Sequence, residues 1–202
     1  MDAIAWTALL VDLGVRPQTA GRWADAFERV LEDSPGQRVG LAYFLGQILH
    51  ESGMLEHVEE NLRYSAERLT AVWPTRFPTL ESARPYAYNA PALAEKVYQG
   101  RLGNTEPGDG YKYRGRGPLQ VTGRANYAAL GPMTGLPLVE SPDLLAQPHA
   151  GLLAAAVWFG NNASGKIPDG VEAVTRAVNG GVHGLAQREA LTALALQKLT
   201  EA

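Results

Sequence analysis

The sequence predicts a mainly helical protein with one small β element. Apolar residues recur every three to four positions over most of the 202-residue chain, which is the period of an amphipathic helix. These runs stop at Gly or at Pro-Gly, as helices do. One segment, residues 103–130, breaks the pattern because it is dense in Gly, aromatic residues and Arg.

The helical pattern divides into eight segments along the chain. In order, the predicted helices span residues 3–14, 17–36, 36–53, 65–73, 91–100, 148–160, 170–181 and 185–199. The third is more buried than the first two, with Leu45 and Leu49 on its apolar side and Gly53 as its C-terminal stop. Asp169 is placed to cap the helix that starts at residue 170.

The glycine-rich segment is too long for a mere connection, and long ordered loops in compact domains are more often functional than not. Within it, residues 118–123 (PLQVTG) are expected to form a short strand with Gln120 and Thr122 on one side. Glycines let the backbone approach a ligand, and Tyr111 and Tyr113 offer flat faces and hydroxyls. Sugar-binding sites use this mixture of residue types.

Composition excludes several classes of function. With 18 basic and 21 acidic residues the net charge is −3, so no general attraction to nucleic acid is expected. The chain has no Cys, which removes disulfides, thiolate zinc sites and a Cys nucleophile. A zinc motif HExxH fails because Met54 stands at the second histidine position, so we expect no metal. A hydrophobic content of 46% is enough to bury a core, and we expect a monomer that folds alone.

The N-terminal segment gives no sign of export. Asp2 stands where a secretion signal needs Lys or Arg, and Asp12 breaks the apolar run. No stretch approaches the ~20 apolar residues of a membrane span. The sequence therefore predicts synthesis in the cytoplasm without stable membrane insertion.

Glutamates crowd the end of the third predicted helix and the segment after it: Glu51, Glu56, Glu59, Glu60 and Glu67. Glu51 follows an apolar run, so it is expected to be partly desolvated, which favours the protonated acid and suits a proton donor. The alternative is an ordinary helix-end glutamate in water. A helix stop at Gly53 would let the chain fold back and bring a second carboxylate to about 6.5–9.5 Å, which admits a water.

Five stretches, taken together and in order, are far more specific than any one of them. They are AYFLGQILHESG, EENLRYSAERLTAVWPTRF, YKYRGRGPLQVTGRANYAALG, SPDLLAQPHAGLLAAAVWF and VTRAVNGG with GLAQR. These stretches resemble family 19 glycoside hydrolases, the plant-type chitinases, and more closely the short phage and bacterial endolysins. The resemblance implies a mainly α, lysozyme-like fold of two lobes, with a small β element lining the cleft. The chain has no internal repeat, low-complexity tract or clear linker, so we expect residues 1–202 to form one catalytic domain without a separate wall-binding module.

The resemblance implies a role for each matching residue. Glu51 matches the general acid and Glu60 the general base, and Thr122 stands where chitinases place a serine that helps to hold the water. The implied substrate-binding residues are Tyr113, Gln120, Asn179 and Arg188. Spacing alone leaves Glu59 open as the base, since it adjoins Glu60. His50 supports Glu51 or is an ordinary helix-end histidine.

The implied function is hydrolysis of the β-1,4 bonds of peptidoglycan glycan strands by single displacement with inversion. The lack of Cys and of long inserted loops favours the endolysin branch, with chitin as the chemically related alternative substrate. No cofactor is required, and release by a holin is expected. A non-catalytic glycan-binding protein would lose one carboxylate, and an amidase or peptidase would need the missing zinc ligands or Cys.

Overall fold

The structure is a computed structural model that describes residues 1–31 and 37–201. Within these ranges the protein is mostly helical. The α-helices are α1 (Ala3–Asp12), α2 (Pro17–Val30), α3 (Arg38–Glu51), α4 (Ala66–Val72), α5 (Leu80–Ala83), α6 (Ala90–Tyr98), α7 (Asp109–Lys112), α8 (Arg124–Thr134), α9 (Pro148–Asn162), α10 (Val171–Asn179) and α11 (Leu185–Glu201). Short 3-10 helices follow α5, α8 and α9: η1 (Arg84–Tyr86), η2 (Pro142–Ala146) and η3 (Ser164–Asp169).

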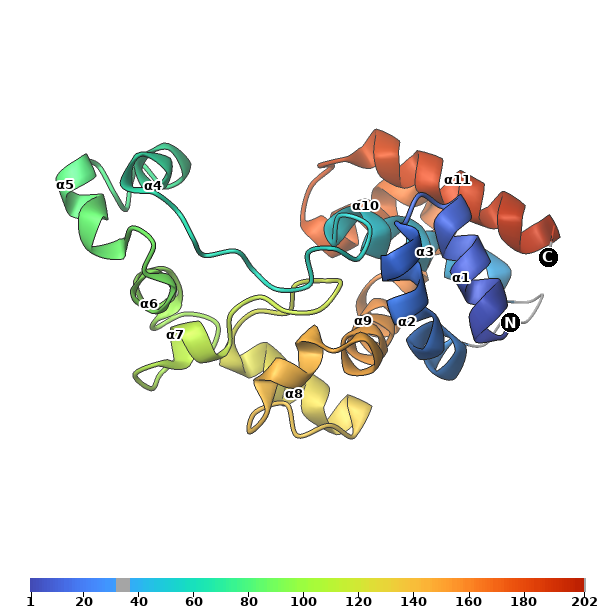
Figure 1. The fold of residues 1–202 in the computed structure, drawn as a ribbon, viewed down its shortest axis with the longest axis horizontal. Helices are drawn as coiled ribbons and strands as arrows, with labels where there is room; N and C mark the ends of the chain where they lie inside the picture. Colours follow the sequence, from blue (N-terminus) through green and yellow to red (C-terminus); the bar gives the residue numbers. More distant parts are fainter. Residues whose placement is uncertain (32–36, 202) are drawn as a thin grey trace.

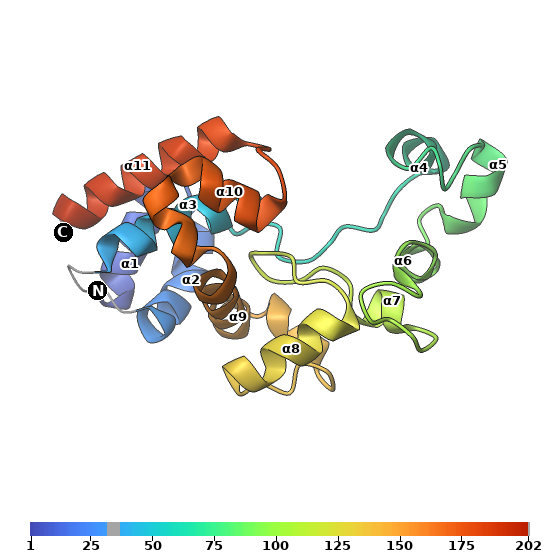
Figure 2. The same cartoon turned by 180° about the vertical axis from the view of Figure 1, so that it is seen from behind.

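The helices form two lobes. Helices α4 to α7 lie at one end of the long axis, and α1 to α3 with α9 to α11 lie at the other (Figure 1). Two segments without helix, residues 57–65 and 113–123, run between the lobes, and the view from behind shows the same separation (Figure 2). Both chain termini belong to the larger lobe (Figure 1).

Each lobe has its own apolar core. The larger core joins α1, α2, α3, α9, α10 and α11 around Trp6, Trp23 and Phe27, all of which are almost fully buried. The smaller core joins α4, α5 and α6 around Leu69 and Phe77. A third cluster packs the glycine-rich segment and α8 against α9. The segment that carries the predicted sugar site therefore rests on a packed base.

The β element consists of single bridges. Among the described residues, Arg116 pairs with Glu59 on one side and with Val121 on the other, both antiparallel. The expected strand at residues 118–123 is thus one bridge of a narrow turn, because Gly117 and Gln120 both have positive φ and bend the backbone. The turn still lines the cleft, as the cavity described below shows.

Sequence periodicity located most helices but missed some. Residues 124–134 form α8, although the sequence predicted a loop up to residue 130. The predicted helix 17–36 ends at Val30, and its expected Pro-Gly stop lies outside the described residues. Asp169 does not cap α10, because it belongs to η3 and the N-cap position is Gly170, which has no side chain.

Candidate active site

Glu51 is the last residue of α3, and the chain reverses directly after it. Gly53, Met54 and Leu55 all have positive φ, of 55°, 61° and 64°. A left-handed conformation costs a residue other than Gly about 1–3 kcal/mol. Fully buried Leu55 offsets much of this, since burying such a side chain contributes about 1.5–3 kcal/mol. The predicted helix stop at Gly53 is confirmed.

The Glu51 carboxylate is held by polar groups. Arg188 donates to it from Nη2, and Asn179 donates from Nδ2 at 3.3 Å. Arg188 also donates to Gln47 Oε1 at 2.6 Å and to the His183 carbonyl at 3.0 Å. The sequence predicted apolar neighbours for this carboxylate, because it could not show that α11 and α10 deliver an arginine and an asparagine to the end of α3.

The structure corrects the prediction that Arg188 is a sugar contact. Its side chain is 0% exposed, so it lies below the surface of the cleft and has no face to offer a glycan. Its partners are Glu51 and Gln47, the latter also fully buried. A buried guanidinium requires such partners. Arg188 therefore holds Glu51 from within the protein.

A cavity of about 370 Å³ lies over Glu51. Its walls are Glu51, Leu102, Leu119, Gln120, Val121, Thr122, Asn126, Trp158, Val178 and Asn179. Four predicted site residues, Glu51, Gln120, Thr122 and Asn179, thus share one space. A cavity of about 610 Å³ between α2, α3 and α9 is larger, but no ionisable side chain is among its described walls. The described walls of the smaller cavity do include an ionisable side chain, that of Glu51.

Glu60 lies on the segment that crosses between the lobes. Its Oε1 accepts a hydrogen bond from the Tyr98 hydroxyl at 2.6 Å, and its Oε2 accepts one from the Gly115 N–H at 3.2 Å. Its backbone N–H donates in return to the Gly115 carbonyl at 2.9 Å. Burial and the hydrogen bond to Glu60 raise the pKa of Tyr98 above its ordinary value, so this phenol stays a donor.

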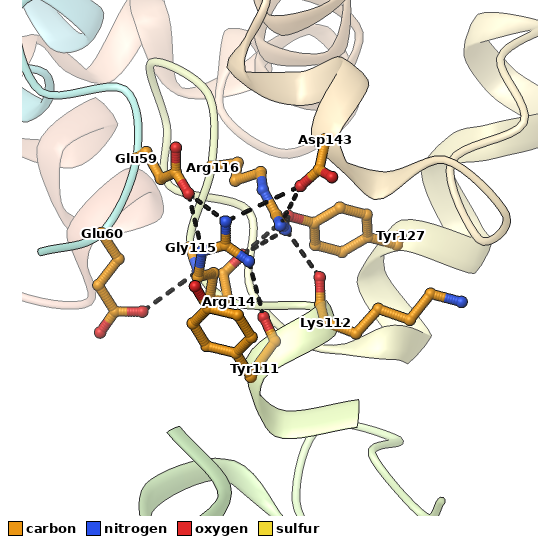
Figure 3. A network of polar contacts seen from close by, with 9 residues as sticks. All are labelled: Glu59, Glu60, Tyr111, Lys112, Arg114, Gly115, Arg116, Tyr127 and Asp143. Carbon is orange, nitrogen blue, oxygen red and sulfur yellow. Dashed lines mark hydrogen bonds and ion pairs between the residues drawn. The ribbon is translucent and has the colours of Figure 1, made fainter. Parts of the chain in front are cut away.

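Glu59 and Glu60 point in different directions (Figure 3). Glu59 forms an ion pair with Arg114, whose Nε lies 2.8 Å from Oε1, while Glu60 turns to Gly115. Adjacent side chains of an extended segment diverge in this way. The Glu59 carboxylate, which spacing left open as the base, is therefore engaged in an ion pair with Arg114.

Gly115 brings Glu60 next to the residues of the cavity wall. A Cβ atom placed on Gly115 would lie 2.8 Å from Gln120 Oε1, 3.2 Å from Thr122 Oγ1 and 3.3 Å from Glu60 Cβ. A methyl group there would require the Gln120 side-chain oxygen to move and Thr122 and Glu60 to give way by a few tenths of an ångström. The Thr122 hydroxyl donates to the Gln120 carbonyl at 2.9 Å, which leaves its lone pairs free to accept a hydrogen bond from a water.

The structure also corrects the prediction that Tyr113 binds substrate. Its side chain is 1% exposed, its ring packs on Tyr127 with centroids 5.3 Å apart, and its hydroxyl donates to the Val139 carbonyl at 2.9 Å. It belongs to the third apolar cluster and presents no face to a sugar. The sequence around a tyrosine beside a glycine-rich turn does not distinguish a side chain buried in the core from one exposed in the cleft.

Sequence reasoning missed other residues of the site. Leu102, Asn126 and Trp158 line the cavity, and Tyr98 holds Glu60. Nothing in the sequence marked Leu102 as a site residue. In the structure its side chain is 46% exposed and its backbone has a positive φ of 54°. Trp158 and Asn126 lie within stretches that carried the family resemblance. Tyr98 is the last residue of α6, and nothing in its sequence context marks it.

The ring of His50 is fixed from α11. Its Nδ1 lies 2.7 Å from Gln187 Oε1, and the ring occupies the space that a Cβ on Gly184 would need.

Among the described residues, no three His, Cys, Asp or Glu side chains converge as a metal site would require. No described helix has the length and apolar content to cross a membrane.

The chain is similar to known glycoside hydrolases. Residues 78–186 match the family 19 model described as chitinase class I. A Haemophilus influenzae protein named glycosyl hydrolase family 19 domain-containing protein is 38% identical over 149 residues, covering 73% of this chain and 74% of that one. An Arabidopsis thaliana endochitinase is 42% identical over 73 residues, 36% of this chain but only 26% of that protein.

The fold agrees with this sequence similarity. The crystal structure of chitinase C from Streptomyces griseus superposes with a TM-score of 0.59 at 18% identity, over 98% of this chain and 92% of that one. The two-lobed, lysozyme-like arrangement predicted from the sequence is thereby confirmed. The chain belongs to glycoside hydrolase family 19 and is a glycoside hydrolase.

Proposed function

We propose that this protein is an endolysin that hydrolyses the β-1,4 bonds of peptidoglycan glycan strands. The observation that carries the proposal is the cavity of about 370 Å³ with Glu51 on one wall and Gln120 and Thr122 on another. Glu60 adjoins that second wall through Gly115. Two carboxylates on separate elements, with space for a water and a sugar, suit an inverting glycosidase.

In the proposed reaction, Glu51 protonates the leaving glycosidic oxygen as the C1–O bond breaks. A water attacks C1 from the opposite face and gives one proton to ionised Glu60. The water can give its other hydrogen in a hydrogen bond to Thr122 Oγ1, whose own proton is directed at Gln120. That arrangement aims a lone pair of the water at C1. The product has the inverted anomeric configuration.

Arg188, Tyr98 and Gly115 supply fixed dipoles and charge around these two groups. Arg188 and Asn179 fix the Glu51 carboxyl, and Tyr98 and the Gly115 N–H fix that of Glu60. Prepositioned donors of this kind spare the reorganisation that water would need. The chemistry requires no cofactor.

Peptidoglycan is favoured as the substrate by the lack of Cys and of long inserted loops. Chitin is the second candidate. It is favoured by the Arabidopsis thaliana endochitinase match and by the likeness to chitinase C. Both polymers are β-1,4-linked and carry N-acetyl groups, so the same acid and base serve either.

The proposed setting follows from the same function. Residues 1–202 would act as one monomeric catalytic domain, made in the cytoplasm and released to the wall through a holin-type pore. Expression in a host without a holin should then be tolerated, and opening the inner membrane should cause lysis. Lysis on expression alone would contradict this setting.

Mass spectrometry of digested polymers tests the proposed function. Purified peptidoglycan and chitin oligomers are incubated with the protein and, as control, with Glu51→Gln. New reducing ends in peptidoglycan would support the endolysin, and the sugar at that end identifies the bond cut. Cleavage of chitin oligomers alone would replace it with a chitinase. Binding of either polymer without any cleavage would indicate a non-catalytic glycan-binding protein.

A further inference from the structure

Glu59 has a partner that connects it to the proposed base. Its carboxylate pairs with Arg114 through both Nε and Nη2. The Arg114 guanidinium also lies 4.3 Å from the centroid of the Tyr111 ring and donates to the Tyr111 carbonyl at 3.0 Å. Its side chain is 15% exposed, against 45% for Glu59. Its Nη2 also lies 3.9 Å from Asp143 Oδ1, so the arginine is held by two carboxylates, a carbonyl and an aromatic face together.

A second arginine fixes the other side of the same turn. Arg116 is 1% exposed and donates to the Lys112 carbonyl at 2.8 Å and to the Tyr127 hydroxyl at 3.1 Å. It also forms an ion pair with Asp143 (Figure 3). Gly115, between the two arginines, is therefore anchored from both neighbours.

The anchored residue is the one that holds Glu60. The Gly115 N–H donates to Oε2 of Glu60 at 3.2 Å, and a Cβ placed on Gly115 would come within 2.8 Å of Gln120 Oε1 and 3.2 Å of Thr122 Oγ1. A shift of the 114–116 turn would move the base, the glutamine and the threonine relative to one another. A displacement of about 1 Å in such a group can cost two orders of magnitude in rate.

We propose that Glu59 is a positioning residue for the base: by pairing with Arg114 it holds the Gly115 amide against Glu60. This inference rests on the proposed role of Glu60. An isolated surface ion pair contributes little to a protein. This one differs because Arg114 is mostly buried and stacked, and because the Glu59 backbone bridges to Arg116 in the same turn.

Steady-state kinetics on a soluble glycan test the proposal with four variants. Glu59→Ala removes the closer of the two carboxylate partners of Arg114, leaving Asp143 at 3.9 Å, and should lower kcat about ten-fold with KM little changed, since no sugar contact is lost. Glu59→Gln keeps an oxygen for Arg114 and should stay within about three-fold of the parent. Asp25→Ala, which breaks the exposed Asp25–Arg29 pair on α2, is the matched control and should change neither constant. Glu60→Gln should be nearly inactive.

An unchanged kcat in Glu59→Ala, beside a nearly inactive Glu60→Gln, would overturn the positioning role and leave the proposed function intact. A loss expressed only in KM would also overturn it, because Glu59 would then be a sugar contact. An active Glu60→Gln would instead overturn the role of Glu60 in the proposed function.

NMR judges the positioning independently of activity. The chemical shift of the Gly115 amide proton reports its hydrogen bond to Glu60, so Glu60→Gln should change that shift. Glu59→Ala should change it as well, while Asp25→Ala should leave it as in the parent protein. An unchanged Gly115 amide shift in Glu59→Ala would overturn the proposal even if no substrate were cleaved.

Discussion

Arg188 holds Glu51 from a position that solvent does not reach. The arginine side chain is 0% exposed and that of the glutamate 24%, so the ion pair joins the protein interior to the cavity wall. The other donors of Arg188 are directed at Gln47 and at the His183 carbonyl. The proposed proton donor is therefore held by a group that lies below the surface of the cavity.

Glu51→Gln should fold normally and lose at least about 100-fold in glycan hydrolysis. The amide oxygen of Gln can still accept from Arg188, so the ion pair becomes a hydrogen bond while the proton donor is lost. Reducing-end release and thermal unfolding measure the two effects. Glu172→Gln, in the exposed Glu172–Arg176 pair of α10, is the control. Activity within a few-fold of the parent would remove Glu51 from the mechanism.

Arg188→Lys should lower both the free energy of unfolding and kcat. Lys cannot reach Glu51, Gln47 and the His183 carbonyl at once, and a buried acceptor left unpaired costs about 1–3 kcal/mol. KM should change little, because Arg188 lies below the cavity. Urea unfolding and steady-state kinetics check this, with Arg176→Lys as the exposed control. A rise in KM alone would show that Arg188 contacts the sugar.

The sequence contained much of the site because local rules fix it. A glycine after an apolar helix stops that helix, so the position of Glu51 beside a chain reversal could be predicted from Gly53. Adjacent side chains diverge, so only one of Glu59 and Glu60 could face the cleft. The family resemblance, rather than spacing, selected Glu60.

The rest depends on contacts between distant residues. Arg188 meets Glu51 across 137 positions, and Tyr98 meets Glu60 across 38. No local pattern encodes such a meeting. The prediction that Tyr113 contacts sugar was wrong for the same reason. The Val139 carbonyl and the Tyr127 ring that bury it belong to later segments of the chain. Short-range periodicity also could not show that residues 124–134 continue as a helix after the glycine-rich turn.

Tyr98→Phe should reduce kcat about ten-fold. The substitution keeps the ring and removes the hydroxyl that donates to Glu60 at 2.6 Å, so the carboxylate loses a donor that fixes its position. Steady-state kinetics on a soluble glycan measure the effect. Tyr88→Phe, at a residue that is 67% exposed on the same lobe, should leave kcat unchanged. An unchanged kcat in Tyr98→Phe would mean that the tyrosine does not act on the base.

Thr122→Ala should lose less activity than Glu60→Gln, and Thr122→Ser should retain most of it. Alanine removes the oxygen that can accept from the water, but Glu60 still activates that water; serine restores the oxygen. Rates of the three variants on one substrate test this order. Equal losses in the alanine and serine variants would show that the methyl group matters rather than the oxygen.

Glu56 should make the stability of the larger lobe depend on pH. It accepts hydrogen bonds from Arg16 Nε at 2.7 Å and from Thr19 Oγ1 at 2.6 Å, which join the start of α2 to the turn after α3. These two hydrogen bonds, that of Arg16 first, lower the pKa of Glu56 to about 2. The unfolded chain has the ordinary value near 4.5. Ionised Glu56 therefore stabilises the fold fully above the unfolded value, and this contribution is lost as the pH falls toward 2.

Glu56→Gln should accordingly lower Tm at neutral pH and converge with the parent protein in acid, because protonated Glu and Gln offer Arg16 a similar neutral acceptor. Calorimetry between pH 7 and pH 2 follows the difference in Tm, which should be constant down to about pH 5 and shrink below it. Glu172→Gln removes an exposed pair on one helix and should give a small difference throughout. A Glu56→Gln difference that stayed the same across the whole range would show that the ionisation of Glu56 is not what joins α2 to the turn beside Glu51.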